Sequence, residues 1–432
     1  MRSSAKNIGI FGLWHLGCVY AASLAKAGFE VTGFDFDVKV INNLKWNSPP
    51  IYEPDLEKIL KKHNNKNLHF TSSQKQFFQK KDYLFITHDV PVDSKDIVQM
   101  EIIDKTFKLL VKYISSVTTI VICSQIPIGS SRKLIRLLET NGIDSKVIYF
   151  PENLRLGQAF NSFLTPDRIV LGSDSMEAME QFKKDFTFLK CPFITMSLES
   201  AEMVKHALNA YLATCISFSS ELSDLSEKSR SNMSDVVKAL KTDKRVSPFA
   251  PINPGLGFAG GTLGRDIQTL KKLARDIKYE PKLLNSVYAV NQDRIPKLVS
   301  KIKSIHTSLK GKSIGILGLT YRPNTDTLRR SMSVDLIAKL KSQGCKIKAF
   351  DPVIKNQIKE YPSVKVCNSI ETFFENLNMV ILMTEWSEFL NINPKLPAEL
   401  VNEKIIIDTK NFLDKEKYEN SGFTVLRMGE GQ

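Results

Sequence analysis

The sequence predicts an α/β protein with two doubly wound parallel-sheet domains joined by a long central helix. Three observations predict this fold. Short apolar segments alternate with helical patterns near the start, an apolar seam with helical spacing follows, and the alternation then returns. Short buried strands separated by helices are typical of parallel sheets covered on both faces. The expected domains are residues 1–198, 199–309 and 310–432.

The N-terminal domain should begin with a strand, a helix and a second strand. Asn7–Phe11 is a short apolar strand, Leu16–Ala27 is a helix of small residues closed by Gly28, and Glu30–Asp35 is the second strand. Further apolar segments predict strands at Asp82–Thr87, Thr118–Cys123, Val147–Phe150, Arg168–Gly172 and Pro192–Met196.

The middle of the chain predicts one long helix. Its apolar residues are separated alternately by three and four positions, which is the spacing of a continuous helical seam. They are Ala201, Val204, Leu208, Tyr211, Cys215, Phe218, Leu222 and Leu225. Ser197 or Ser200 is suited to cap the start of this helix. A helix of about thirty residues would bridge domains or form a dimer interface, at about 1.5 Å per residue.

The last part of the chain repeats the opening pattern. The stretch from Gly318 to Asp351 resembles that from Gly12 to Asp35, because each has a glycine after a strand, then a helix, then a strand followed by an aspartate. The expected elements are the strands Ser313–Leu317, Cys345–Phe350, Met379–Thr384 and Lys404–Asp408, with a helix at Ser331–Lys341. The repeat predicts two Rossmann-like domains around a helical middle.

A nucleotide-binding turn is predicted where the first strand meets the first helix. Gly12 and Gly17 are the first and third glycines of a G-x-G-x-x-G fingerprint, and Trp14 stands at the second. The first glycine allows the tight turn, and the third lets the helix pack on the sheet. Asp35 ends the second strand, where a carboxylate accepts ribose hydrogen bonds and favours NAD over NADP. A strand–helix turn without a ligand is the alternative.

The charge leaves several classes of partner open. The 432 residues include 60 basic and 46 acidic side chains, which gives a net charge of +14. That charge suits a nucleic-acid binder, a membrane-surface binder or an enzyme for phosphorylated substrates, besides a basic surface without a specific partner. Zinc-finger spacing, RNP motifs and basic stretches interleaved with aromatics are absent from the sequence, so we expect no nucleic-acid partner.

Composition and cysteine usage predict a cytoplasmic globular protein. Hydrophobic residues make up 42% of the chain and charged residues 25%, which excludes disorder as the dominant state. No apolar run approaches the length of about 18 residues that a membrane span needs, and the start of the chain has no signal-peptide core. The six cysteines form no C-x-x-C pair, so we expect reduced, mostly buried thiols and no metal site.

Seven short segments together resemble one enzyme family. They are Pro50–Pro54, Pro151–Arg155, Lys205–Asn209, Pro254–Gly261, Arg265–Asp266, Tyr321–Asp326 and Thr384–Trp386. Through their order and spacing, nearly the whole chain resembles the UDP-glucose/GDP-mannose dehydrogenase family. The resemblance implies an NAD-binding N-terminal domain, a homodimer formed through the central helix, and a C-terminal domain for the nucleotide of a UDP- or GDP-sugar. It also implies oxidation of that sugar by NAD in polysaccharide precursor synthesis.

The usual reaction of the family oxidises a C6 alcohol twice, through an aldehyde held on a cysteine as a thiohemiacetal. The first step needs a proton acceptor and donors around the developing oxyanion. Lys205 and Asn209 are four residues apart, so they project from one helix face. The resemblance implies that Lys205 and Asn209 stabilise the oxyanion and that Asp266 positions a water molecule. It also implies that Glu152 is a retained catalytic acid. A Lys–Asn pair on a solvated helix face is the alternative.

Four positions depart from the family pattern. Thr262 stands where the family has its cysteine, Leu156 replaces a second common glutamate, Gln125 replaces a threonine, and Trp14 replaces a glycine. A threonine hydroxyl is a poor nucleophile without an adjacent base, and no histidine is near Thr262 in sequence. Cys215 is a poor substitute, because it lies about 15 Å beyond Lys205 along a straight helix.

These departures suggest one oxidation rather than two. The hypotheses are a two-electron oxidation, oxidation of a hydrated aldehyde without a covalent intermediate, or oxidation at a different carbon. The expected substrate is UDP-glucose or a UDP-N-acetylhexosamine-like sugar. The alternative is a protein of another functional class, namely a homologue that still binds nucleotides but has no catalytic activity.

The remaining candidate residues bind ligands. The predicted cofactor contacts are Gly12, Trp14, His15, Leu16, Gly17, Asp35 and Gln125. The predicted substrate contacts are Leu154, Arg245, Gly257, Phe258, Gly260, Tyr321, Arg322 and Arg329. Glycine permits close backbone approach to a ligand, and arginine matches the geometry of a diphosphate. Each arginine is as easily explained as a surface charge.

Overall fold

The computed structural model describes residues 5–93, 96–151, 154, 156–259 and 261–431. The chain forms two compact units, residues 1–208 and 209–432. The division between them falls inside one helix, α9 (Leu198–Ser229). Among the described residues, no helix is both long enough and apolar enough to cross a membrane.

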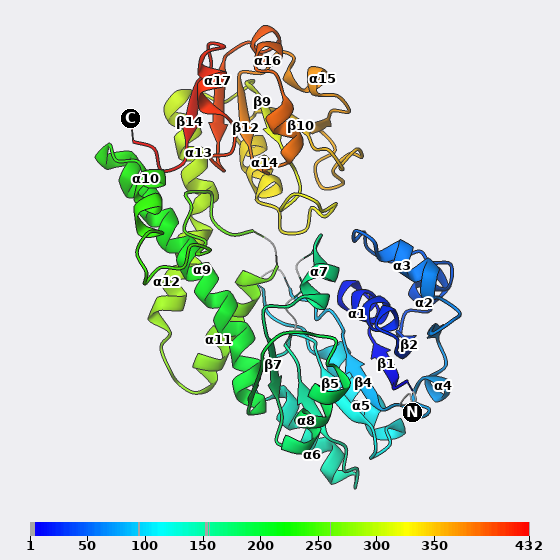
Figure 1. The fold of residues 1–432 in the computed structure, drawn as a ribbon. Coiled ribbons are helices and arrows are strands. Elements are labelled where there is room, and N and C mark those ends of the chain that lie inside the picture. Colours follow the sequence, from blue (N-terminus) through cyan, green and yellow to red (C-terminus); the bar gives the residue numbers. More distant parts are fainter. Residues whose placement is uncertain (1–4, 94–95, 152–153, 155, 260, 432) are drawn as a thin grey trace. The chain divides into compact units, whose positions relative to one another are not determined.

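The first unit is built on an eight-stranded sheet with the order β3-β2-β1-β4-β5-β6-β7-β8 (Figure 1). The strands are β1 (Asn7–Phe11), β2 (Glu30–Phe34), β3 (Leu68–Thr71), β4 (Tyr83–Ile86), β5 (Thr119–Ile122), β6 (Val147–Tyr149), β7 (Ile169–Gly172) and β8 (Phe193–Met196). Neighbouring strands run parallel except β6 and β7, which pair antiparallel. The strands predicted for this unit are confirmed with slightly shorter bounds, and β3 was not predicted.

Helices cover both faces of this sheet. They are α1 (His15–Lys26), α2 (Val38–Lys45), α3 (Leu56–His63), α4 (Gln74–Phe77), α5 (Glu101–Tyr113), α6 (Ser130–Thr140), α7 (Ala159–Leu164) and α8 (Met176–Asp185). Because side chains alternate along a strand, Ile10 packs in one core with α1 and α8, whereas Phe11 packs in another with α5 and α6. The sheet is therefore buried on both faces, as the apolar runs predicted.

The second unit begins with the remainder of α9 and a set of helices, and ends in a second sheet. The helices before the sheet are α10 (Met233–Leu240), α11 (Leu263–Asp276), α12 (Lys282–Gln292) and α13 (Arg294–Ile305). The sheet strands are β9 (Ser313–Leu317), β10 (Lys346–Phe350), β11 (Lys365–Val366), β12 (Met379–Leu382), β13 (Ile405–Asp408) and β14 (Thr424–Arg427). The intervening helices are α14 (Met332–Ser342), α15 (Ile370–Phe374), η1 (Ser387–Asn391), α16 (Lys395–Leu400) and α17 (Lys415–Glu419).

The two sheets share one strand order. The second sheet runs β11-β10-β9-β12-β13-β14, all parallel, which repeats the order of the first six strands of the first unit. The backbone N–H of Gly12 donates to the carbonyl of Phe34, and that of Gly318 donates to the carbonyl of Phe350. The predicted repeat and the two Rossmann-like domains are confirmed.

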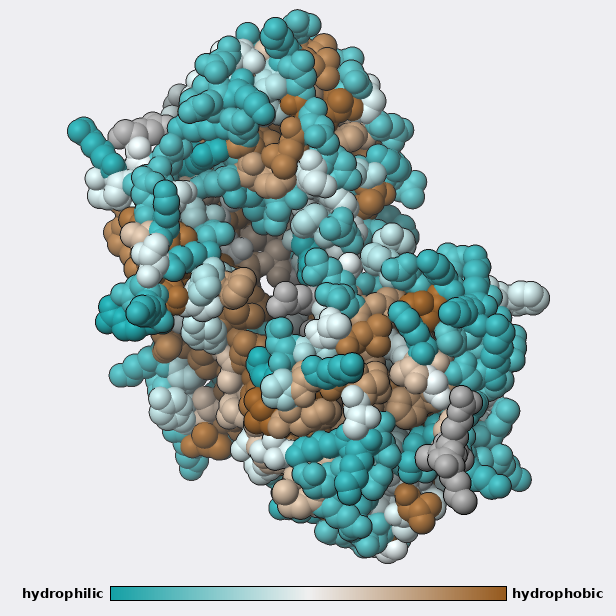
Figure 2. Space-filling view, viewed as in Figure 1, coloured by the Kyte–Doolittle hydropathy of each residue, from teal (hydrophilic) through white to brown (hydrophobic). Residues whose placement is uncertain are grey.

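Helix α9 is 32 residues long and starts where the sequence predicted. The Ser197 hydroxyl accepts from the Ser200 amide at 3.2 Å, so Ser197 is the cap. Part of the apolar seam remains on the surface, since Tyr211, Phe218 and Leu225 are more than half exposed. Figure 2 shows further apolar side chains at the surface over the helices of this unit, among a largely hydrophilic covering.

Candidate active site

The turn between β1 and α1 has the geometry of a dinucleotide site. Gly12 adopts a φ of +102°, and its carbonyl accepts from the Thr87 hydroxyl at 2.7 Å. A Cβ atom on Gly17 would lie 1.7 Å from the Gly12 carbonyl oxygen, so the helix could not approach the turn with any other residue there. The first and third glycines therefore have the structural roles that the fingerprint requires.

Replacing Gly17 with alanine should destabilise the first unit. The added methyl group overlaps the Gly12 carbonyl, and overpacking of this kind costs about 1–3 kcal/mol of unfolding free energy. Denaturant unfolding measures the loss. Gly261→Ala is the matched control, because a Cβ atom there would meet nothing within 4 Å. Equal stability of both variants would contradict this account of the turn.

Asp35 holds the same turn. One carboxylate oxygen accepts from the Leu13 amide at 2.6 Å, and the other accepts from the Asp37 amide at 2.9 Å. Asp35 is half-buried at the carboxyl end of β2, where it can also face a ribose. Trp14, the residue in place of the second glycine, precedes α1 and is 43% exposed. Leu16 and His15 belong to the first turn of α1.

In the second unit, Asp351 occupies the position that Asp35 has in the first. Asp351 is fully buried, and one oxygen accepts from the Leu319 amide at 2.7 Å and the Trp386 ring nitrogen at 3.2 Å. The other oxygen accepts from the Val353 amide at 3.0 Å. Both oxygens of Asp351 thus accept hydrogen bonds from the protein itself. At this position the second domain therefore has no half-exposed acid of the kind that suits a dinucleotide ribose.

Two residues missed in the sequence support the cofactor turn. His88 is buried and packs closely against Gly12, and its Nε2 lies 2.9 Å from the Thr106 hydroxyl. Burial, with a smaller effect of the Lys105 charge, lowers the pKa of His88 to about 3, so the ring is neutral. Glu53 is also buried and bonds to His15. Glu53 lies in one of the segments that carried the family resemblance, whereas His88 had no sequence signal.

The candidate catalytic residues Asn209 and Asp266 meet in the interior of the second unit. Asn209, from α9, is 5% exposed and donates from Nδ2 to Asp266, which is fully buried in the first turn of α11. Lys205 lies one helical turn before Asn209 in α9 and is also buried. A solvated helix face is therefore the wrong description of these positions. Glu152 lies outside the described residues.

Thr262 stands at the residue before α11 and is exposed. Its carbonyl accepts from the Asp266 amide at 3.1 Å, and its hydroxyl does not cap the helix. Gln125 is buried after β5, and Leu154 packs against the core that contains α1. Leu156 is half-buried.

The glycine loop of the second unit rests on α12. Gly257 has a φ of +105°, and Phe258 exchanges two hydrogen bonds with the Asn291 side chain, at 2.8 and 3.1 Å. The Phe258 ring packs with Ala213 and Ile267, so it faces a small core. Asn291 had no signal in the sequence. Gly260 lies outside the described residues.

The glycine loop and the turn after β9 line one small cavity within the second unit. Leu256 and Ala259 contribute from the loop, and Tyr321 contributes from the turn. Arg322 is half-buried beside Tyr321, and Arg329 is exposed. Arg245 is also exposed and pairs with Asp243 at 2.7 Å. Of the predicted substrate contacts, Tyr321 lines this cavity, and the glycine loop contributes its neighbouring residues Leu256 and Ala259.

Two Rossmann-like domains with a dinucleotide turn define a protein of the nucleotide-binding class. Family models match three consecutive parts of the chain: the NAD binding domain at residues 6–189, the central domain at 199–293 and the UDP binding domain at 315–415. The chain belongs to the UDP-glucose/GDP-mannose dehydrogenase family. The resemblance in the sequence is confirmed, as is NAD as the cofactor.

Named relatives and solved structures match along almost the full length. UDP-glucose 6-dehydrogenase of Rickettsia typhi is 33% identical over 98% of this chain and 99% of its own. UDP-glucose 6-dehydrogenase YwqF of Bacillus subtilis is 29% identical over 94% of this chain and 93% of its own. A UDP-glucose dehydrogenase from Pyrobaculum islandicum superposes with a TM-score of 0.89 at 24% identity, covering 100% of this chain and 99% of that chain.

Proposed function

We propose that this protein oxidises a UDP-sugar with NAD, with UDP-glucose or a UDP-N-acetylhexosamine as the substrate, in polysaccharide precursor synthesis. The observation that carries the proposal is the buried Asn209–Asp266 hydrogen bond, one helical turn after Lys205. Buried polar groups of this kind are costly unless they are paired or used. Family membership and the relatives named as UDP-glucose 6-dehydrogenases support the same activity.

The proposed chemistry follows from the types of residue retained. NAD, held by the turn between β1 and α1, would supply the hydride acceptor. As the sugar alcohol loses its proton, negative charge develops on its oxygen. Lys205 and Asn209 donate hydrogen bonds to that oxygen. One N–H of the Asn209 amide is held by Asp266, which fixes the orientation of the amide and leaves the second N–H for the substrate. Asp266 therefore positions Asn209, besides any water that it binds.

We propose a single oxidation for this chain. Thr262 is exposed at the start of α11 in the position of the family cysteine, and Leu156 and Gln125 replace two further polar positions. Without a thiol at this position, the aldehyde cannot form the thiohemiacetal from which a second hydride would leave. The same departures would also fit a homologue that binds nucleotides but has lost its catalytic activity. The retained Lys205, Asn209 and Asp266 argue against that alternative.

A substrate panel separates the two candidates. Purified protein is mixed with NAD and, separately, with UDP-glucose, UDP-N-acetylglucosamine, UDP-N-acetylmannosamine and GDP-mannose, and NADH is followed by absorbance. We expect NADH with at least one UDP-sugar. If the protein binds NADH but forms none with any sugar, the homologue without catalytic activity is the correct description.

The proposed assembly is a homodimer through α9, and the proposed location is the cytoplasm. Three exposed apolar residues of α9, namely Tyr211, Phe218 and Leu225, are spaced by seven, as in a helix that packs against another. The cysteines are all free, which suits a reducing compartment. Residues 1–198, 199–309 and 310–432 are the proposed cofactor, dimerisation and nucleotide-sugar parts.

Placing a charge in that stripe should dissociate the dimer. Phe218→Glu would bury an unpaired carboxylate, which costs several kcal/mol at an interface (about 2–5 kcal/mol). Sedimentation at micromolar concentration should then show a monomer. Trp46→Glu is the control, because Trp46 is 84% exposed in the other unit. A Phe218→Glu dimer as tight as the unmodified one would contradict assembly through this stripe.

A further inference from the structure

Glu53 connects two parts of the first unit that are far apart in sequence. Its Oε2 lies 2.8 Å from His15 Nε2 and accepts from the Gly157 amide at 2.8 Å. Its Oε1 accepts from the Ala159 amide, also at 2.8 Å. Both carboxylate oxygens are thus occupied, one by two donors. These three contacts join residues separated by 38, 104 and 106 positions.

The carboxylate is charged although it is buried. The Glu53 side chain is 1% exposed. Burial alone would raise the pKa, but hydrogen bonds from His15 and the Ala159 and Gly157 amides outweigh it, so the pKa of Glu53 lies below its ordinary value. Hydrogen bonds to an ionised acceptor are stronger and more directional than neutral ones. The network is therefore suited to hold its three donors in one arrangement.

One end of the network is the cofactor turn. His15 is the first residue of α1, where the first helix N–H groups have no partner within the helix and attract a phosphate. The first turn of α1 carries no acidic side chain. Because Glu53 holds His15 Nε2, the ring of His15 has a defined orientation at the place expected for the cofactor diphosphate.

The other end is the backbone that follows the candidate acid Glu152. Gly157 has a φ of +83°, and Ala159 is the first residue of α7. Anchoring both amides fixes the backbone at the point where it enters α7. Glu53 therefore holds the backbone that directly follows Leu156.

We propose that Glu53 is a positioning residue of the reaction, which holds His15 at the cofactor turn and the backbone at Gly157 and Ala159 in one arrangement. This inference rests on the proposed function. It gives Glu53 a role that acts through His15 and the backbone, not through contact with NAD or the sugar. Its consequence is that loss of the Glu53 charge weakens cofactor binding and sugar turnover together, whereas loss of His15 affects the cofactor alone.

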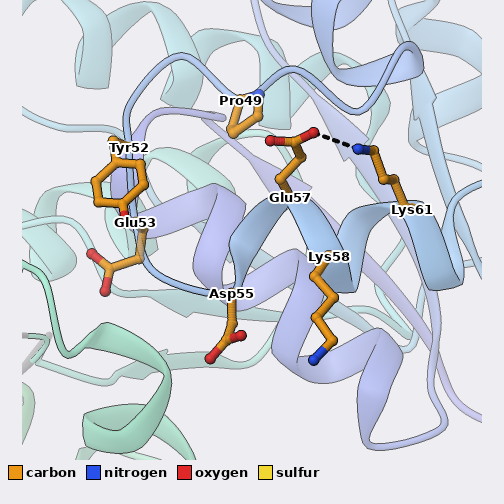
Figure 3. A pocket seen from close by; sticks show the side chains of 7 residues that line it. All are labelled: Pro49, Tyr52, Glu53, Asp55, Glu57, Lys58 and Lys61. Carbon is orange, nitrogen blue, oxygen red and sulfur yellow. Dashed lines mark ion pairs between the residues drawn. The ribbon is translucent and has the colours of Figure 1, made fainter.

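The surroundings of Glu53 supply a matched control. Glu53 lines a cavity of about 510 Å³, together with Pro49, Tyr52, Asp55, Glu57, Lys58 and Lys61. Figure 3 shows that Glu57 faces Lys61, whereas the Glu53 carboxylate points away from that pair. The Glu57–Lys61 ion pair is 61% exposed on each side, and exposed pairs contribute little to stability. Glu57→Gln therefore removes the same charge from the same region without touching the network.

The test compares Glu53→Gln, Glu53→Asp, His15→Gln and Glu57→Gln in the full chain. NADH affinity is measured by fluorescence, and kcat and KM for the UDP-sugar are measured from NADH formation, both per mole of folded protein. Glu53→Gln should weaken NADH binding about ten-fold and also raise the sugar KM or lower kcat about ten-fold. His15→Gln should weaken NADH binding only, and Glu57→Gln should match the unmodified protein.

Two further results make the proposal falsifiable. The double variant His15→Gln/Glu53→Gln should bind NADH no more weakly than Glu53→Gln alone, because both act on one contact. Glu53→Asp, which keeps the charge on a shorter side chain, should recover part of both losses. If Glu53→Gln lowers only the yield of folded protein, with normal NADH affinity, kcat and KM, Glu53 is merely structural. If the unmodified protein forms no NADH, the proposed function fails instead.

Discussion

One NADH is expected for each UDP-sugar consumed, with an aldehyde or ketone as the product. In the proposed chemistry, the first hydride transfer uses Lys205 and Asn209, which the chain retains, whereas the covalent route to a second one uses a thiol at position 262. Thr262 offers only a hydroxyl, exposed at the start of α11. Absorbance gives the NADH formed, and chromatography gives the sugar consumed and the oxidation state of the product. Two NADH per sugar with a carboxylate product would contradict the single oxidation.

The matched variant for this experiment is Thr262→Cys. A thiol at this position can add to the aldehyde, and the thiohemiacetal can then lose a second hydride to NAD to give a thioester, which water hydrolyses to the acid and the free thiol. We expect the yield to rise above one NADH per sugar. An unchanged yield would show that the missing thiol is not what limits this chain to a single oxidation.

Replacing Lys205 with alanine should lower kcat about 100- to 1,000-fold with little change in KM. An oxyanion donor acts mainly in the transition state, and removing one such donor costs about this much in other enzymes. Steady-state kinetics with the UDP-sugar identified by the panel measures both constants. The variant should still bind NADH, because the cofactor turn lies on β1 and α1.

The control for Lys205→Ala lies in the same helix. Lys228 is in the last turn of α9 and is exposed, whereas Lys205 is buried. Lys228→Ala should therefore leave kcat and KM unchanged. If Lys205→Ala changes kcat only slightly while NADH binding stays intact, Lys205 has a structural role in the interior and takes no part in the chemistry.

The local sequence pattern was enough to predict the cofactor turn, the long helix and most of the strands. Gly12 and Gly17 could be assigned to the cofactor turn because a tight turn and a close helix contact restrict the residue type at single positions. The long helix could be predicted because its apolar spacing extends over many turns. The strands β3, β11 and β14 were not predicted, because β11 has only two residues and β3 and β14 contain only two apolar residues each.

Contacts between distant residues had no such signal. Asn291 supports the glycine loop from 33 positions away, and only the packing of α12 brings the two together. His88 reaches Gly12 because β4 lies next to β1 in the sheet. Neither position could be recognised from residue type, because buried histidine and helical asparagine occur in many proteins for structural reasons alone.

The sequence by itself determined the fold class, the family and the departures at Thr262, Leu156, Gln125 and Trp14, because each of these depends on residue type and spacing along the chain. The tertiary structure alone decided that Asn209 and Asp266 are hydrogen-bonded in the interior and that Glu53 joins His15 to the backbone near α7. The physical reason is that burial and hydrogen bonding depend on which segments the fold brings together, and these segments lie tens of residues apart.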